Sequence, residues 1–117
     1  MVLTQTDQMA IRTVISEHLQ ALQASQGSRA FALTARPLQQ RYKSAANFVR
    51  IIRTNYPPLC QPRSVVFESL TYFQNIPTQL VMFLSQRSEL FRAIYLMEKQ
   101  SMRRWLILDW YWFQVEE

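Results

Sequence analysis

The spacing of apolar residues changes about halfway along the chain. In the N-terminal half they recur every three or four residues, as on one face of an α-helix. The C-terminal half contains four runs rich in β-branched and aromatic residues, at 65–73, 78–85, 89–99 and 104–115, separated by short polar connectors. Short connectors favour antiparallel neighbours. The pattern predicts an α+β fold in one domain spanning 1–117, with N-terminal helices over about 5–56 packed on a four-stranded antiparallel sheet over about 63–115.

Several residues mark the ends of the predicted helices. Thr4, with Asp7 three residues later, predicts a capping box in which each side chain accepts an otherwise unpaired backbone N–H. Gly27 can adopt a positive φ, so we expect it to end the first helix. Ser44 suits the N-cap of a later helix, and Pro57-Pro58 stops that helix because proline has no backbone N–H.

Both faces of the predicted sheet are apolar. Side chains alternate along a strand, so Trp105, Ile107, Asp109 and Tyr111 should share one face of the last strand. The outer face is expected to carry a larger apolar set: Leu106, Leu108, Trp110, Trp112, Ile94, Leu96 and Met82. A hydrated face of an antiparallel sheet should be polar, and the helical half is large enough to cover only one side.

This apolar outer face predicts an interaction surface. The favoured interpretation is a non-catalytic protein-interaction module that forms a homodimer or serves as a small subunit of a larger assembly. The alternative is a strongly curled sheet whose concave side is filled by the chain's own side chains.

Composition narrows the possible functions. The chain has 117 residues, of which 49% are hydrophobic, so disorder is excluded. A single cysteine, Cys60, excludes a disulfide framework and a multi-cysteine zinc site, and a single glycine excludes a glycine-rich phosphate loop. We therefore expect no cofactor and no metal. No signal-peptide pattern and no membrane-spanning stretch is visible, which together with the lone cysteine predicts a cytoplasmic protein.

Basic residues are concentrated in one part of the chain. The net charge is +5, and no acidic residue occurs between Glu17 and Glu68. The predicted basic patch comprises Arg41, Lys43, Arg50, Arg53 and Arg63. Such a patch would attract an acidic protein surface, a phosphate or a nucleic acid, unless it is simply a solvated face. No nucleic-acid-binding motif is present, so we do not expect nucleic acid to be the partner.

Several segments resemble a known family. They include Ala30-Phe31-Ala32-Leu33, the run from Phe48 through Tyr56-Pro57-Pro58-Leu59, and Ala93-Ile94-Tyr95-Leu96-Met97-Glu98. In these the chain resembles the uncharacterised bacterial family known as domain of unknown function 4864. The order of elements is similar to the nuclear transport factor 2-like, or cystatin-like, superfamily. That resemblance implies a cone in which a curved sheet wraps the helices, leaves a pocket and often dimerises through its outer face.

The resemblance also suggests an alternative function. Nuclear transport factor 2-like isomerases and dehydratases use carboxylates, histidines and tyrosines in their pocket. In this chain the candidates are His18, the only histidine, Asp109, the only acid within the last strand, and Tyr111. If they converge, His18 could act as a base, and the protein could bind or transform a small apolar ligand. The simpler interpretation is that His18 is a hydrogen-bonded helix residue and Asp109 pairs with an arginine.

Overall fold

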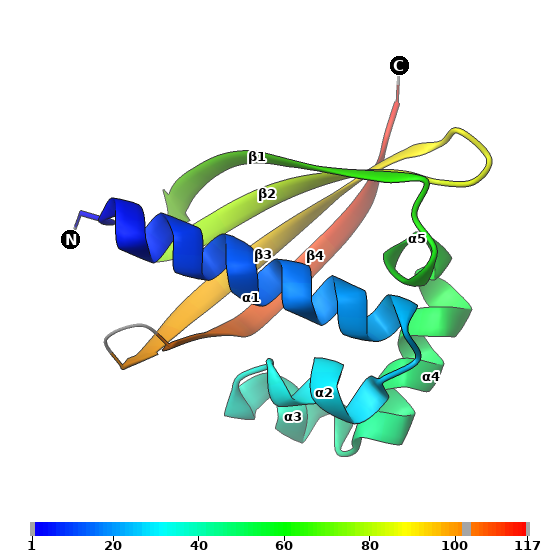
Figure 1. The fold of residues 1–117 in the computed structure, drawn as a ribbon, viewed down its shortest axis with the longest axis horizontal. Coiled ribbons are helices and arrows are strands. Elements are labelled where there is room, and N and C mark those ends of the chain that lie inside the picture. The colour runs from blue at the N-terminus through cyan, green and yellow to red at the C-terminus, as the bar shows by residue number, and fades with distance from the viewer. Residues whose placement is uncertain (1, 102–103, 117) are drawn as a thin grey trace.

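The computed structural model describes residues 2–101 and 104–116, in which five helices precede four strands (Figure 1). The helices are α1 (Gln5–Gln23), α2 (Gly27–Ala32), α3 (Arg36–Tyr42), α4 (Ala45–Asn55) and α5 (Pro57–Cys60). The strands are β1 (Ser64–Phe73), β2 (Ile76–Leu84), β3 (Leu90–Ser101) and β4 (Arg104–Val115). This arrangement confirms the predicted α+β class.

Two of the predicted helix starts are confirmed by their hydrogen bonds. The backbone N–H of Asp7 donates to Thr4 Oγ1 at 3.0 Å, and the backbone N–H of Thr4 donates to Asp7 Oδ2 at 3.1 Å. The capping box therefore satisfies two of the N–H groups that begin α1. At α4, Ser44 Oγ accepts the backbone N–H of Asn47 at 3.1 Å.

The prediction for Gly27 is wrong. α1 ends at Gln23, and the positive φ that follows it, 59°, belongs to Ser25. Gly27 instead begins α2, where an added Cβ would collide with the side chain of Val49 on α4. The residue is small because α2 and α4 approach closely there, and not because the backbone needs a left-handed conformation.

The Pro57-Pro58 pair both ends one helix and begins another. α4 stops at Asn55, as predicted, but the prolines open the short helix α5, which the sequence pattern did not predict. Proline suits the first turn of a helix because the N–H that it lacks has no intrahelical partner there. Of the described residues, none forms a helix that is both long and apolar enough to cross a membrane.

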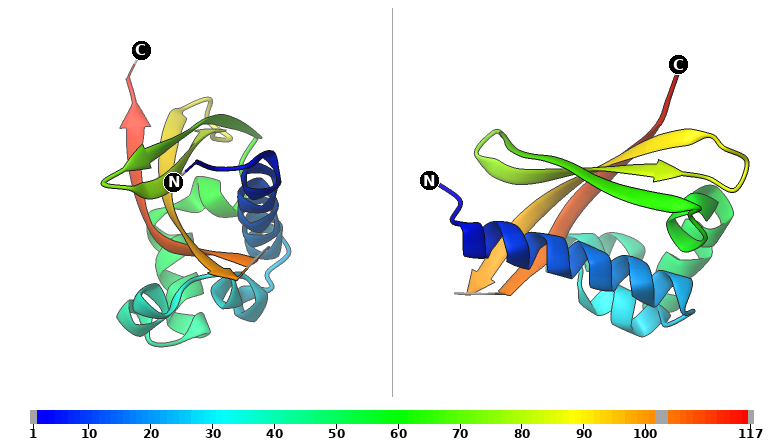
Figure 2. Two further views of the ribbon diagram at one scale, coloured as in Figure 1. Left: turned by 90° about the vertical axis from the view of Figure 1, so that its left-hand side faces the viewer. Right: turned by 45° about the horizontal axis from the view of Figure 1, so that its top comes forward.

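The strands form an antiparallel meander in the order β1-β2-β3-β4. β1 and β2 are joined through Gln74 and Asn75, whose φ angles of 50° and 66° match a type I′ hairpin turn built without glycine. The sheet is strongly curved and the helices lie on its concave side (Figure 2). The edge strand β4 is partly covered, since Ala35 N donates to Ile107 O at 2.8 Å and Ile107 N donates to Leu33 O at 2.9 Å.

A β-bulge in β4 overturns the predicted assignment of its faces. Met97 of β3 pairs with Ile107, but the preceding residue, Leu96, pairs with Asp109, so Leu108 is an extra residue. Beyond the bulge the alternation is reversed. Trp110 and Trp112 consequently face the helices, on the same side as Ile107 and Trp105.

The concave side of the sheet holds the core. Its largest fully buried side chains come from helices and strands alike and include Trp105, Tyr95, Phe48, Phe83, Ile11 and Ile15. A second bulge, between Phe67 and Leu70 of β1, is held by Gln79, which is 1% exposed. Its Nε2 lies 3.0 Å from the carbonyl oxygen of Glu68 and 2.9 Å from that of Leu80. This amide satisfies carbonyl groups that the irregular pairing would otherwise leave unpaired.

Candidate functional site

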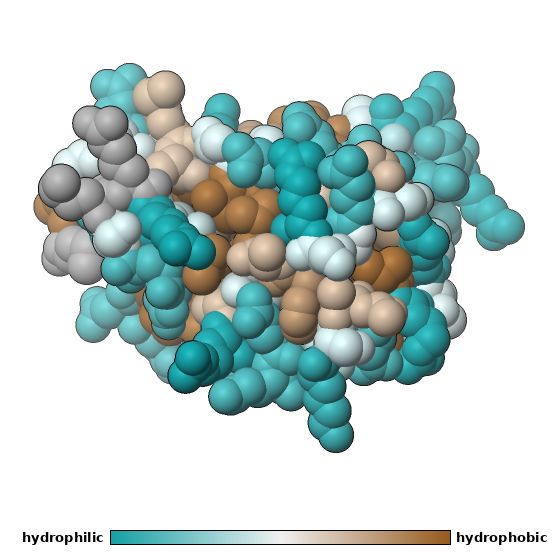
Figure 3. All heavy atoms as spheres, turned by 60° about the horizontal axis from the view of Figure 1, so that its bottom comes forward, coloured by the Kyte–Doolittle hydropathy of each residue, from teal (hydrophilic) through white to brown (hydrophobic). Residues whose placement is uncertain are grey.

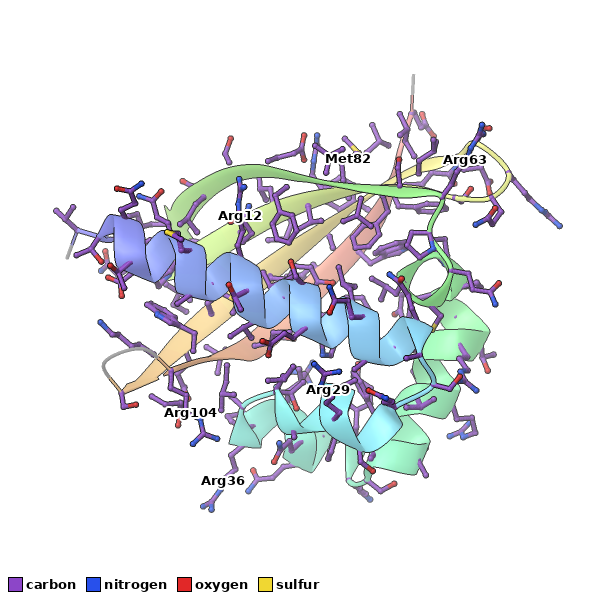
Figure 4. All side chains as sticks on the ribbon, in the orientation of Figure 1. Arg12, Arg29, Arg36, Arg63, Met82 and Arg104 are labelled. Atoms are coloured by element: carbon purple, nitrogen blue, oxygen red, sulfur yellow. The ribbon has the colours of Figure 1, made fainter. Side chains whose placement is uncertain are left out.

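The convex side of the sheet is not covered by any helix of the described residues (Figures 1 and 2). Val81, Phe83, Ala93 and Tyr95 are buried on the concave side, so the residues between them face outward. We define the outer sheet face by these positions and their cross-strand partners. The apolar ones are Val66, Leu80, Met82, Leu84, Leu90, Ile94, Leu96, Leu106, Tyr111, Phe113 and Val115, and the polar ones are Ser64, Thr78, Arg92, Glu98 and Asp109. Met82 points away from the helices (Figure 4).

Exposure differs across this face. Val66 is 57% exposed, Tyr111 54% and Phe113 42%. The predicted interface residues Met82, Ile94, Leu106 and Leu108 are partly exposed, whereas Leu96 is only 6% exposed.

Trp110 and Trp112, which were predicted for the interface, lie on the other side of the sheet. The Trp110 ring is 4.7 Å from the Tyr56 ring, centroid to centroid, and the Trp112 ring stacks on Phe91 at 5.0 Å. Their predicted outward orientation is wrong because of the bulge at Leu108. Tyr111 and Phe113 take their place on the outer sheet face.

Arg92 of the outer sheet face forms an ion pair with Glu68 of the β1 bulge. Arg92 Nε donates to Glu68 Oε1 at 2.8 Å, and Arg92 Nη2 donates to Glu68 Oε2 at 3.2 Å. Both side chains are about one-third exposed. The hydrogen bonds to Glu68 raise the pKa of the Arg92 guanidinium. Because the pair is bidentate, the two charges are fixed in place and cancel one another within the apolar surface.

Asp109 also forms an ion pair. Its Oδ1 accepts Arg41 Nη1 at 3.0 Å and the backbone N–H of Trp110 at 2.8 Å, while Oδ2 accepts Arg41 Nη2 at 3.3 Å. The hydrogen bond to Asp109 raises the pKa of Arg41. Asp109 pairs with Leu96 in the sheet, which places it on the convex side, and Arg41 reaches it from α3.

His18 lies in a different part of the molecule. It is 5% exposed, its Nδ1 is 2.9 Å from the carbonyl oxygen of Ala30, and its ring is 5.8 Å from that of Phe48. Burial lowers the pKa of His18 to about 4, although the hydrogen bond to Ala30 opposes this shift. The imidazole is therefore neutral at pH 7, and it joins α1 to α2.

The structure does not bring the candidate catalytic residues together. His18 lies on the concave side, in contact with the helices, while Asp109 is bound to Arg41 on the convex side. Tyr111 points outward and is 54% exposed. These three residues therefore do not form an acid–base pair with one another.

Five cavities formed by the described residues differ from the aromatic pocket expected for a ligand-binding cone. Five described cavities have volumes of about 320 to 470 Å³, and no more than one aromatic side chain of the described residues lines any of them. One of about 410 Å³ lies between α1, α2 and the start of β4, where Figure 3 shows an apolar hollow. Neither His18 nor Asp109 lines any of these five.

Among the residues that the structure describes, two buried side-chain polar atoms have no hydrogen-bond partner. They are the hydroxyl of Tyr95 and Nε1 of Trp105, and burial raises the pKa of the Tyr95 phenol. The free Cys60 is buried, which raises the pKa of its thiol. Residues 2–101 and 104–116 contain no group of three His, Cys, Asp or Glu side chains that could hold a metal ion.

The residues of the predicted basic patch are contributed by several different elements. Arg41 is neutralised by Asp109. Arg63 immediately precedes β1 (Figure 4), and its Nη1 donates to Ser88 Oγ at 3.0 Å. Lys43 forms the C-cap of α3, and Arg50 and Arg53 lie on α4.

Comparison with known proteins gave one match. The model of a family described as domain of unknown function (DUF4864) matches residues 4–115. Neither the curated proteins nor the solved structures include one that matches the chain.

Proposed function

The chain belongs to the family described as domain of unknown function (DUF4864), and from that premise we propose that it is a non-catalytic protein-interaction module that pairs with a second copy of itself through the outer sheet face. The observation that supports this proposal is the apolar convex surface, with Val66, Tyr111 and Phe113 between 42% and 57% exposed. Contiguous apolar surface of this kind usually marks an interaction site.

The size of the outer sheet face is suited to a second copy. Four strands about 4.8 Å apart, each contributing about seven residues at ~3.3 Å, span roughly 19 by 23 Å, or about 440 Å² in projection. The accessible area of a pleated surface is larger than its projection. The projection alone is about half of the ~800 Å² per partner that a stable interface of standard size buries.

The charges on the face are compatible with self-association. The chain as a whole carries +5, so two copies repel each other over most of their surface. On the outer sheet face, Arg92 is already paired with Glu68, and Asp109 is paired with Arg41. A neutral face does not oppose the approach of an identical face. In a two-fold dimer Arg92 of each copy can also lie close to Glu68 of the other.

Ile94 provides the test because it pairs with both Leu80 and Tyr111 and therefore lies in the middle of the face. We expect the wild-type protein to sediment as a dimer at about 100 μM, and Ile94→Glu to give a folded monomer because it would bury a charge in the contact. The matched control is Met9→Glu, which places the same charge on a residue of α1 that is 63% exposed. It should leave the dimer intact.

Two outcomes would overturn the proposal. One is a wild-type monomer at this concentration, including one that binds only a different protein. The other is an Ile94→Glu variant that dimerises as well as wild type. Circular dichroism of each variant shows whether the fold is retained.

Two finer assignments belong to the same proposal. The curved four-stranded meander with helices on its concave side supports placement in the nuclear transport factor 2-like superfamily. The single free thiol of Cys60 supports a reducing compartment such as the cytoplasm. A solved structure of this protein with a different connectivity would reject the first, and localisation of the tagged protein outside the cytoplasm would reject the second.

A further inference from the structure

Three arginines of the helical layer lie near one another. Arg53 Nη2 donates to Ser25 Oγ at 2.8 Å, and Arg29 Nη1 donates to Gln26 Oε1 at 3.1 Å. Because Ser25 and Gln26 are consecutive residues, these two guanidinium groups lie within about 15 Å of each other. Arg50 is three residues before Arg53 on α4 and therefore on the same side of that helix. We call Arg29, Arg50 and Arg53 the arginine cluster.

The positive charge of the arginine cluster is not compensated. Each of its guanidinium groups is bound by a neutral oxygen, from Ser25, Gln26 or Asn47. Among the residues that the structure describes, the ion pairs formed by lysines and arginines involve other side chains. A guanidinium has five N–H donors in a planar fork, so each member retains donors for a carboxylate while its position is already fixed.

A cavity adjoins the cluster. Its volume is about 380 Å³, and it is lined by Arg53 together with Leu22, Gln23, Ser25, Pro57, Cys60 and Gln61. This space is large enough for an Asp or Glu side chain, and the surrounding amide and hydroxyl groups can donate to a carboxylate. Burial raises the pKa of Cys60, so the thiol is uncharged at pH 7 and does not repel an anion.

We propose that the arginine cluster binds an acidic segment of another polypeptide, with one Asp or Glu side chain entering the cavity beside Arg53. The cluster is exposed and lies on the helical layer, on the other side of the molecule from the outer sheet face. The proposal therefore does not depend on dimerisation.

The size and composition of this surface favour an acidic polypeptide over a nucleic acid. Proteins that bind duplex DNA typically contact about 6–10 phosphates, whereas this cluster has only three charges. The distance of about 15 Å between the guanidinium groups of Arg29 and Arg53 corresponds to about five residues of an extended polypeptide. Proteins that bind single strands stack bases on exposed aromatic rings. In the described residues the exposed aromatic side chains, Tyr72, Phe73, Tyr111 and Phe113, all lie on strands.

A labelled hexaglutamate peptide is a suitable probe, with binding followed by fluorescence anisotropy at about 50 mM salt. The double variant Arg50→Gln/Arg53→Gln should weaken binding about five- to tenfold, as expected for the loss of two exposed charge contacts. The control, Arg12→Gln/Arg87→Gln, removes the same net charge from α1 and from the β2–β3 turn and should change affinity less than twofold. Both arginine pairs are exposed, and Arg29→Gln offers a second, independent substitution within the cluster.

The result that would overturn the proposal is an equal loss of affinity in the two double variants, because binding would then depend on net charge alone. Absence of peptide binding by wild type would do the same. So would a twelve-nucleotide RNA or DNA that binds wild type more tightly than the peptide and loses affinity in Arg50→Gln/Arg53→Gln.

Discussion

The stability of the fold should fall in mild acid because of His18. The imidazole is 5% exposed, its Nδ1 is 2.9 Å from the Ala30 carbonyl oxygen, and its ring faces Phe48. No carboxylate among the described residues is hydrogen-bonded to it, so a second proton would place an uncompensated charge between α1, α2 and α4. Protonation of His18 therefore requires either local opening or unfolding.

The size of the effect follows from the two pKa values. The pKa is 6.5 for an ordinary histidine and about 4 for His18 in the fold. The unfolded chain thus binds the proton first, and stability is lost as pH falls from about 6.5 towards 4. At 1.36 kcal/mol per unit, the full loss is about 3 kcal/mol, of which about 2 kcal/mol is already lost at pH 5. Asp7 does not contribute to this range, because its pKa is lowered below 3.8 and its stabilisation is lost only in stronger acid.

Urea denaturation of wild type and His18→Gln at pH 7 and pH 5 measures this effect. Glutamine can donate to the Ala30 carbonyl oxygen but does not titrate in this range. We expect wild type to lose about 2 kcal/mol between the two pH values and the variant to lose less than about 0.5 kcal/mol. If both proteins lose the same amount, His18 is not the group responsible and the argument fails.

The remaining predictions concern packing and the backbone. Trp110→Ala should lower the free energy of unfolding by about 3 kcal/mol in urea denaturation. The neighbouring Tyr111 faces outward, so Tyr111→Ala should lower it by less than about 1 kcal/mol in a monomeric background. A larger loss for Tyr111→Ala than for Trp110→Ala would reject the bulge. Gln79→Leu should lower the free energy of unfolding by about 2 kcal/mol, because carbonyl groups of the β1 bulge would lose their hydrogen-bond donor. An unchanged free energy of unfolding would show that water replaces the amide. Gly27→Ala should lower Tm because the added methyl group collides with the Val49 side chain. Adding Val49→Ala should recover most of the lost Tm. If the double variant does not recover Tm, α2 and α4 do not approach each other closely at this point.

Residues that act through local geometry could be predicted from the sequence. The spacing of Thr4 and Asp7, the N-cap Ser44 and the position of Pro57-Pro58 correctly located the start of α1, the start of α4 and the end of α4. The change of period from about 3.6 to 2 correctly predicted helices followed by an antiparallel meander.

The role of Gly27 could not be predicted in this way. Its lack of a side chain is required by Val49, 22 positions later, through the packing of α2 on α4. A glycine near a helix end is compatible with either a left-handed cap or a close approach, and only the tertiary structure distinguishes them.

At the candidate site, too, some features could be predicted from the sequence and others depended on the tertiary structure. By itself the sequence determined that the strands are apolar on both faces, and hence that the protein has more apolar sheet than its helices cover. Tertiary structure decided which residues face outward, because the bulge at Leu108 reverses the alternation and exchanges Trp110 and Trp112 for Tyr111 and Phe113. A bulge depends on how β4 pairs with β3, and leucine carries no local signal for it.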